Sequence, residues 1–146
     1  MTTIHRSAIV PYRAAQMFNL VADIPSYPLF LPWCGGARIV STQGNEVTAA
    51  IDIAYAGVHK SFSTRNVLQP EQSIDIHLLK GPFSHLRGFW QFKPLDEQAC
   101  KISLDLEFEV ANIMVSLVLT PVFTTIANQL VDGFHRRAVQ LYGTPT

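Results

Sequence analysis

Residues 113–142, near the end of the chain, constrain the fold more than any other stretch. Placed on a helix at about 100° per residue, their apolar and polar side chains fall in opposite sectors. The apolar stripe consists of Leu119, Phe123, Ile126, Ala127, Leu130, Phe134, Ala138 and Leu141. Burying each large apolar side chain gains roughly 1.5–3 kcal/mol, so the stripe predicts a long helix packed on a partner surface. Asn112 is its predicted N-cap, and Pro121 is predicted to kink it.

The partner surface is predicted to be a sheet, because the preceding chain alternates apolar and polar residues with a period of two. The predicted strands are residues 4–10, 37–42, 46–55, 58–68, 74–78, 86–92 and 102–110. Two short helices, residues 14–22 and 27–31, lie between the first and second strands. Short turns between strands predict antiparallel pairing. The predicted fold class is therefore α+β, with a curved antiparallel sheet of about seven strands around a long C-terminal helix.

The length of 146 residues indicates one domain over residues 1–146, since it lies in the usual one-domain range. Hydrophobic residues make up 48% of the chain and charged residues 15%, which is apolar for a globular domain. Some of this apolar surface could line a cavity. A dry, filled core is the alternative, because protein interiors are normally close-packed.

Charge and cysteine content restrict the partners. Eleven basic and eleven acidic residues give a formal net charge of zero, so no long-range field attracts DNA or an anionic membrane. The longest apolar run, residues 113–119, is too short to span a bilayer. We therefore expect a cytoplasmic protein with no DNA partner and no membrane span. Cys34 and Cys100 fit neither a disulfide framework nor a zinc motif, and are predicted to be reduced.

Residues for catalysis are sparse, so the protein is predicted not to be an enzyme. Asp105, Glu107 and Glu109 alternate with apolar residues and lie on the wet face of a predicted strand. The five histidines lack metal-ligand spacing, and the sequence contains no phosphate loop or nucleophile elbow. No metal and no required cofactor are predicted.

One motif resembles a known family. Residues 21–34 read VADIPSYPLFLPWC, and a strand containing Trp90-Gln91-Phe92 follows. Together they resemble the coenzyme Q-binding and ribosome association toxin family of the START-like superfamily, over nearly the whole chain. The resemblance implies a helix-grip fold with an apolar tunnel between sheet and helix. In one branch it implies a polyprenyl quinone cargo and a role in respiration, and in the other binding to the large (50S) ribosomal subunit that blocks subunit joining.

The tunnel that the resemblance implies gives a set of candidate ligand contacts, for each of which plain core packing is the alternative. Small residues facing the helix, such as Ala49 and Gly88, favour open space there. Arg137 lies beside the apolar stripe and could donate to a ligand headgroup, or act only as a cation at the helix end. The candidate contacts are Tyr27, Phe30, Leu31, Trp33, Ile51, Ile53, Ile76, Leu86, Trp90, Phe92, Leu104, Leu106, Phe123, Ile126, Leu130 and Arg137.

The opposite face of the sheet is the candidate surface for ribosomal RNA. Its outward basic residues are Arg65, His77, His85, Arg87, Lys93 and Lys101. Three acidic residues on the same face, Asp75, Asp105 and Glu107, reduce its net positive charge. A mixed face of this kind is ordinarily just solvent-exposed sheet.

The sequence and the family resemblance together give three functional hypotheses. The main hypothesis is non-enzymatic binding of ubiquinone or a related polyprenyl lipid in support of respiration. The alternative is a toxin that binds the 50S subunit and blocks subunit association. A cyclase-like enzyme is the second alternative, because related START-like domains include cyclases. The sequence does not predict the oligomeric state.

Overall fold

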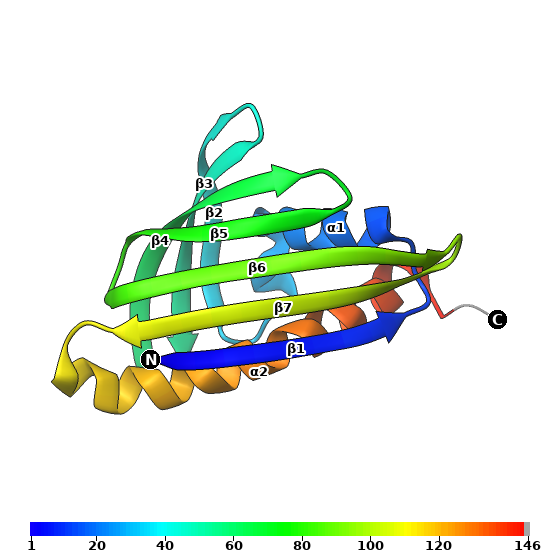
Figure 1. Cartoon of the computed structure of the whole chain (residues 1–146). Coiled ribbons are helices and arrows are strands. Elements are labelled where there is room, and N and C mark those ends of the chain that lie inside the picture. The colour runs from blue at the N-terminus through cyan, green and yellow to red at the C-terminus, as the bar shows by residue number, and fades with distance from the viewer. Residues whose placement is uncertain (145–146) are drawn as a thin grey trace.

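The computed structural model describes residues 1–144 and consists of one seven-stranded antiparallel sheet with a long helix across its concave side (Figure 1). The strand order is β1-β7-β6-β5-β4-β3-β2. The elements are β1 Thr2–Val10, α1 Ala14–Ala22, η1 Ile24–Leu29, β2 Cys34–Gln43, β3 Glu46–Tyr55, β4 Val58–Gln69, β5 Ser73–Lys80, β6 Phe83–Asp96, β7 Ala99–Val110 and α2 Ile113–Tyr142. The predicted fold class is confirmed. The last two residues of the predicted domain, 145 and 146, lie outside the described part.

The inner face of the sheet carries the core. In β7 every second residue from Cys100 to Val110 is buried, while Lys101, Asp105 and Glu109 are exposed. The same alternation runs through β6, where Leu86, Trp90 and Phe92 are buried. This burial matches the predicted one-sided pattern of an antiparallel sheet.

Helix α2 begins at the predicted cap. The Asn112 side chain accepts hydrogen bonds from the backbone N–H groups of Met114 (2.8 Å) and Val115 (3.1 Å), which satisfies two N–H groups that a helix N-terminus leaves unpaired. Most of the predicted stripe is buried. Leu130 is only half-buried and Leu141 is 52% exposed, because Leu141 follows Ala138, the last buried residue of the helix.

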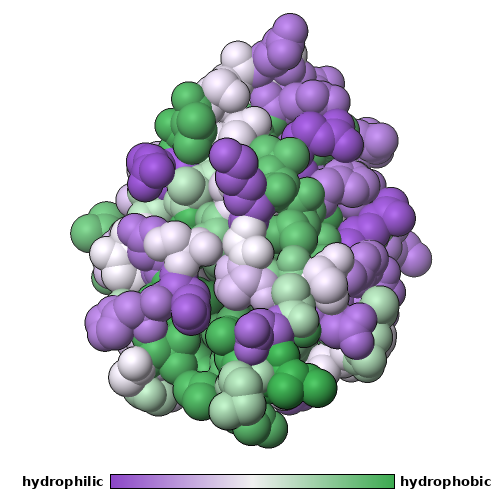
Figure 2. Space-filling view, turned by 90° about the vertical axis from the view of Figure 1, so that its left-hand side faces the viewer, coloured by the Kyte–Doolittle hydropathy of each residue, from purple (hydrophilic) through white to green (hydrophobic). Residues whose placement is uncertain are grey.

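The first turns of α2 project past the sheet and leave apolar side chains in solvent. Ile113, Met114, Leu117 and Val118 are 58–80% exposed. Figure 2 shows hydrophobic side chains gathered along the lower edge of this end of the molecule. Within residues 1–144, α2 is the one helix that is long and apolar enough to cross a membrane by length and composition alone. Its buried face contacts β1 and β7, and the absence of a membrane span stays a prediction.

Several predicted boundaries are wrong by a few residues. The second short helix is a 3-10 helix, Ile24–Leu29, rather than residues 27–31, because Pro25 can occupy the start of a helix. Strand β2 begins at Cys34 rather than at the predicted residue 37, with a bulge between Cys34 and Gly36. Strand β6 continues to Asp96, beyond its predicted end at residue 92, because a bulge between Pro94 and Asp96 accommodates the proline.

Both cysteines are free and buried, as predicted. Burial raises the pKa of the Cys100 thiol to about 11 and also raises the pKa of Cys34. Both thiols are therefore protonated and poorly reactive at neutral pH.

Candidate functional site

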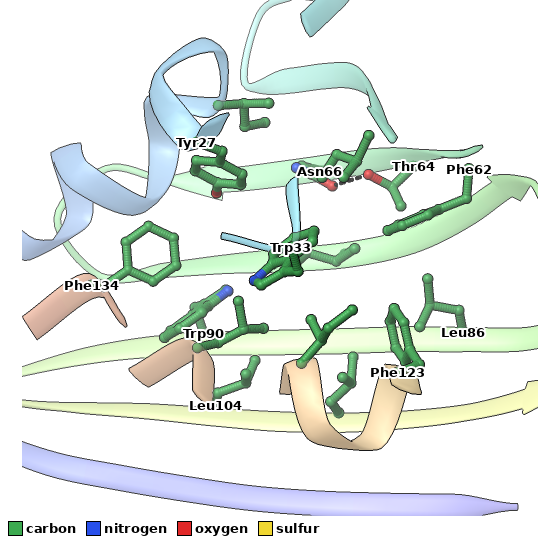
Figure 3. A pocket seen from close by; sticks show the side chains of 16 residues that line it. Tyr27, Trp33, Phe62, Thr64, Asn66, Leu86, Trp90, Leu104, Phe123 and Phe134 are labelled. Atoms are coloured by element: carbon green, nitrogen blue, oxygen red, sulfur yellow. Dashed lines mark hydrogen bonds between the residues drawn. The ribbon is translucent and has the colours of Figure 1, made fainter. Parts of the chain in front are cut away.

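A cavity lies between the inner face of the sheet, helix α2 and the η1 loop (Figure 3). Its volume is about 80 Å³, which is small beside the roughly 300–1,000 Å³ of typical ligand pockets. The lining side chains are Ile24, Tyr27, Trp33, Ile51, Phe62, Thr64, Asn66, Ile76, Leu86, Trp90, Leu104, Leu106, Phe123, Ile126, Leu130 and Phe134. Among them Ile51, Ile76 and Leu130 are only half-buried, so the cavity approaches solvent beside these three residues.

Gly88 helps to keep this space open. It lies on β6 directly between Ile76 of β5 and Leu106 of β7. A Cβ atom at this position would lie 3.2 Å from Leu106 Cδ1 and 3.4 Å from Ile76 Cδ1. A larger residue here would push these two lining side chains into the cavity.

An aromatic cluster closes the end of the cavity near η1. Phe134 of α2 makes edge-to-face contacts with Tyr27, Phe30 and Trp90, with ring centroids 5.4–5.5 Å apart. The Arg137 guanidinium carbon lies 5.0 Å from the centroid of the Phe30 ring, a cation–π contact. The closed end therefore depends on contacts between α2 and the short η1 segment.

Tyr27 is anchored rather than free to react. Its hydroxyl donates a hydrogen bond to the Val21 carbonyl. Burial raises its pKa far above the ordinary value, and Cys34 and Asp23 raise it further. Among the described lining residues, Tyr27 is the one with a titratable side chain, so the lining holds no group that could transfer protons near neutral pH.

Thr64 and Asn66 form a polar pair in the otherwise apolar wall. The Thr64 hydroxyl donates to Asn66 Oδ1 over 2.9 Å. Both residues lie on the inner face of β4 and are 3% and 7% exposed. Figure 3 shows the pair at the cavity wall, with the labelled indole rings of Trp33 and Trp90 across from it.

The structure brings many of the candidate contacts to this one cavity. Those that line it are Tyr27, Trp33, Ile51, Ile76, Leu86, Trp90, Leu104, Leu106, Phe123, Ile126 and Leu130. Ile24, Phe62, Thr64, Asn66 and Phe134 also line it but were not predicted as contacts. Alternation from Phe62 along β4 places Thr64 and Asn66 on the same inner face, and this signal could have found them.

Five candidates lie elsewhere. Leu31 is buried in the core, where a Cβ atom at Gly133 of α2 would lie 2.9 Å from its Cδ2. Ile53 is 1% exposed in the core. Phe92 stacks on Trp90, with ring planes 11° apart, outside the lining. Phe30 is half-buried behind Tyr27, and Arg137 covers Phe30 rather than the cavity.

Ion pairs and histidine–carboxylate contacts dominate the outer face of the sheet. Arg65 pairs with Glu46 (2.8 Å), His85 with Glu107 (2.9 Å) and Arg87 with Asp75 (3.4 Å). His77 also approaches Asp75 (3.4 Å), and His5 contacts Asp105. Exposed pairs of this kind contribute about 0–1 kcal/mol each.

Lys93 and Lys101 differ from the paired residues. They are directly opposite each other on β6 and β7, exposed, and take part in no ion pair within residues 1–144. Like charges directly opposite each other are destabilising in an antiparallel sheet. In the same part of the chain, no three His, Cys, Asp or Glu side chains gather to hold a metal ion.

Comparison with known proteins first identifies the class. Residues 10–135 match the family described as "Polyketide cyclase / dehydrase and lipid transport", and the chain belongs to this family. The aromatase/cyclase Zhui from Streptomyces has the same fold, with a TM-score of 0.82 at 17% identity over 99% of each chain. The 18 kDa protein CC1736 from Caulobacter crescentus has a TM-score of 0.77 at 30% identity, over 99% of this chain and 100% of that one.

Individual relatives carry more specific names than the family does. The chain is 47% identical over 142 residues to the "Ribosome association toxin RatA" of Pseudomonas aeruginosa, covering 97% of this chain and 99% of that protein. It is 45% identical to the protein of the same name from Escherichia coli, over 97% and 90%. A more distant relative is the mitochondrial "Coenzyme Q-binding protein COQ10 homolog B" of Xenopus laevis, at 23% identity over 94% and 58%. The resemblance seen in residues 21–34 is therefore confirmed.

Proposed function

We propose that this protein associates with ribosomes in the cytoplasm, and that it binds the large (50S) subunit so that the subunits do not join. The observation that carries the proposal is 47% identity, over 97% of the chain, to a protein named ribosome association toxin. This favours the alternative hypothesis from the sequence over the quinone carrier.

The outer face of the sheet is the proposed contact surface. Binding to RNA depends on cations that approach phosphates. Lys93 and Lys101 supply two cations with no acidic partner among the described residues, and a phosphate between them would relieve their mutual repulsion. A second basic row on the outer face crosses β4, β5 and β6 and consists of Arg65, His77 and Arg87. Acidic neighbours neutralise part of its charge.

Sedimentation tests this function directly. Purified protein is layered on a sucrose gradient with isolated 50S or 30S subunits at low salt, and its position is followed by immunoblot. We expect it to travel with 50S subunits and to reduce 70S formation when both subunits are mixed. Protein that stays at the top of the gradient would contradict the proposal.

A second proposed function is the binding of a neutral apolar molecule, such as ubiquinone or a related polyprenyl lipid, without catalysis. The supporting observation is the cavity, whose lining is apolar apart from Thr64 and Asn66 at the wall. The family description includes lipid transport, and one relative is named coenzyme Q-binding. A volume of about 80 Å³ means that a polyprenyl quinone requires displacement of lining side chains, or has most of its tail outside.

Organic extraction of the purified protein followed by mass spectrometry tests this second function. We expect a co-purifying or exchangeable neutral lipid. Absence of any such lipid, with no uptake of added ubiquinone, would contradict it. The cyclase alternative has less support: the likeness to Zhui shows the fold alone, and the lining offers no proton-transfer group near neutral pH.

A further inference from the structure

The Asn66 side chain has one half of its hydrogen-bonding capacity in use. Its Oδ1 accepts from the Thr64 hydroxyl, and this is the one hydrogen bond that the side chain makes within residues 1–144. The Nδ2 group carries two N–H donors. Asn66 is 7% exposed and lines the cavity, so these donors face the cavity rather than bulk water.

The Asn66 donors keep accessible surface, because Asp75 Oδ1 is the one fully buried polar side-chain atom without a hydrogen-bond partner within residues 1–144. A polar group in an apolar wall carries a desolvation cost when nothing bonds to it, and β-branched or aliphatic residues would fill this position of β4 without that cost. The Thr64 hydroxyl holds the amide by its oxygen, so the nitrogen is directed away from Thr64 (Figure 3). The pair therefore leaves the Asn66 N–H donors available to a molecule inside the cavity.

The chemistry of the wall restricts what that partner can be. No Lys, Arg or His and no Asp or Glu is among the lining residues, and an unpaired charge in such a site is strongly disfavoured. A fatty acid carboxylate or a phosphate headgroup therefore does not fit. A hydrocarbon fits the apolar wall but leaves the Asn66 donors unused.

We propose that Asn66 Nδ2 donates a hydrogen bond to a carbonyl-type oxygen at the buried end of a neutral, apolar ligand. This inference rests on the second proposed function and adds the ligand class and the residue that selects it. At about 80 Å³ the cavity accommodates a small polar end, and an apolar tail would leave beside the half-buried side chains of Ile51, Ile76 and Leu130.

Two probes of the same shape test the inference: 2-heptanone, and 2-methyl-1-heptene, which carries C=CH₂ in place of C=O. Binding is followed by the fluorescence of Trp33 and Trp90, the chain's two tryptophans, both of which line the cavity. We expect Asn66→Leu to weaken ketone binding by about three- to tenfold, the effect of one hydrogen bond, and to leave alkene binding unchanged or tighter. Comparing both probes in both proteins isolates the Asn66–oxygen interaction.

A second measurement needs no variant. In a ¹⁵N NMR spectrum of the wild type, the Asn66 side-chain NH₂ signal should shift with 2-heptanone and much less with the alkene. Asn19→Leu, which changes an exposed asparagine on α1, should leave both affinities unchanged.

The outcomes separate the two proposals. If neither probe nor added ubiquinone binds the wild type, ligand binding itself fails, and this inference fails with it. If both probes bind but Asn66→Leu weakens them equally, or the NH₂ signal responds alike to both, the cavity binds ligands and the role of Asn66 is wrong.

Discussion

At the residue scale, Thr64 and Asn66 form a hydrogen-bonded polar pair in an otherwise apolar wall. Replacing both partners of a buried hydrogen bond by apolar groups of similar shape is nearly neutral or stabilising. We therefore expect Thr64→Val/Asn66→Leu to leave the free energy of unfolding in urea unchanged within about 1 kcal/mol, or to raise it. A loss of more than about 2 kcal/mol would show that the pair is structural.

The buried thiol of Cys100 and the buried hydroxyl of Tyr27 make the free energy of unfolding depend on pH in the alkaline range. Burial raises the pKa of Cys100 to about 11 and also raises that of Tyr27. Above pH 9 the unfolded chain releases these protons while the folded chain retains them, so the free energy of unfolding falls as pH rises. We expect denaturant midpoints to fall between pH 8 and pH 10.5, with a shallower fall in Cys100→Ala. Equal slopes in both proteins would contradict this assignment.

The site was only partly predictable from individual residues. Alternation in β6 and β7 placed Leu86, Trp90 and Leu104 on the inner face, and the structure finds them at the cavity. Asn66 was missed because residues 58–68 contain many polar residues around Phe62, which hides the inner row of β4. The cavity volume depends on how side chains from seven separate elements fill the interior, and no local pattern carries that information.

At the scale of elements, α2 combines an exposed start with a buried middle. Leu117 is 71% exposed and Leu119 is 1% exposed, two residues further along the same helix. Leu119→Ala should therefore lower the free energy of unfolding by about 2–5 kcal/mol, whereas Leu117→Ala should change it by less than about 0.5 kcal/mol. Chemical denaturation of the matched pair measures both. Comparable losses would mean that the first turns of α2 are covered in solution.

The elements themselves were largely predictable. Helices α1 and α2 and strand β3 have the predicted boundaries, because their hydrophobic periods are regular and capping or turn residues flank them. The boundaries failed where tertiary packing competed with local signals. Strand β6 continues past Pro94 because β7 pairs with it as far as Ala99, and η1 begins at Ile24 because that side chain is buried in the core.

At the scale of the whole molecule, the two proposed functions use opposite faces of the sheet. The cavity lies on the concave side and the charged rows lie on the outer side. We expect Asn66→Leu to leave sedimentation with 50S subunits unchanged while it alters ketone binding. A parallel loss of both would show that ligand and ribosome binding are coupled.

Ribosome association through the outer face is the central claim, and the salt dependence of 50S binding tests it most directly. The affinity of wild type, Lys93→Glu/Lys101→Glu and a control is measured at several salt concentrations. The control Lys60→Glu/Arg136→Glu changes two exposed cations that lie off the outer face, one in the inner row of β4 and one on α2. Each lost phosphate contact lowers the slope of log affinity against log salt by about 1. The account predicts a slope smaller by about 2 and weaker binding in the Lys93/Lys101 variant alone. Wild-type affinity and slope in that variant, or equal losses in both, would contradict it.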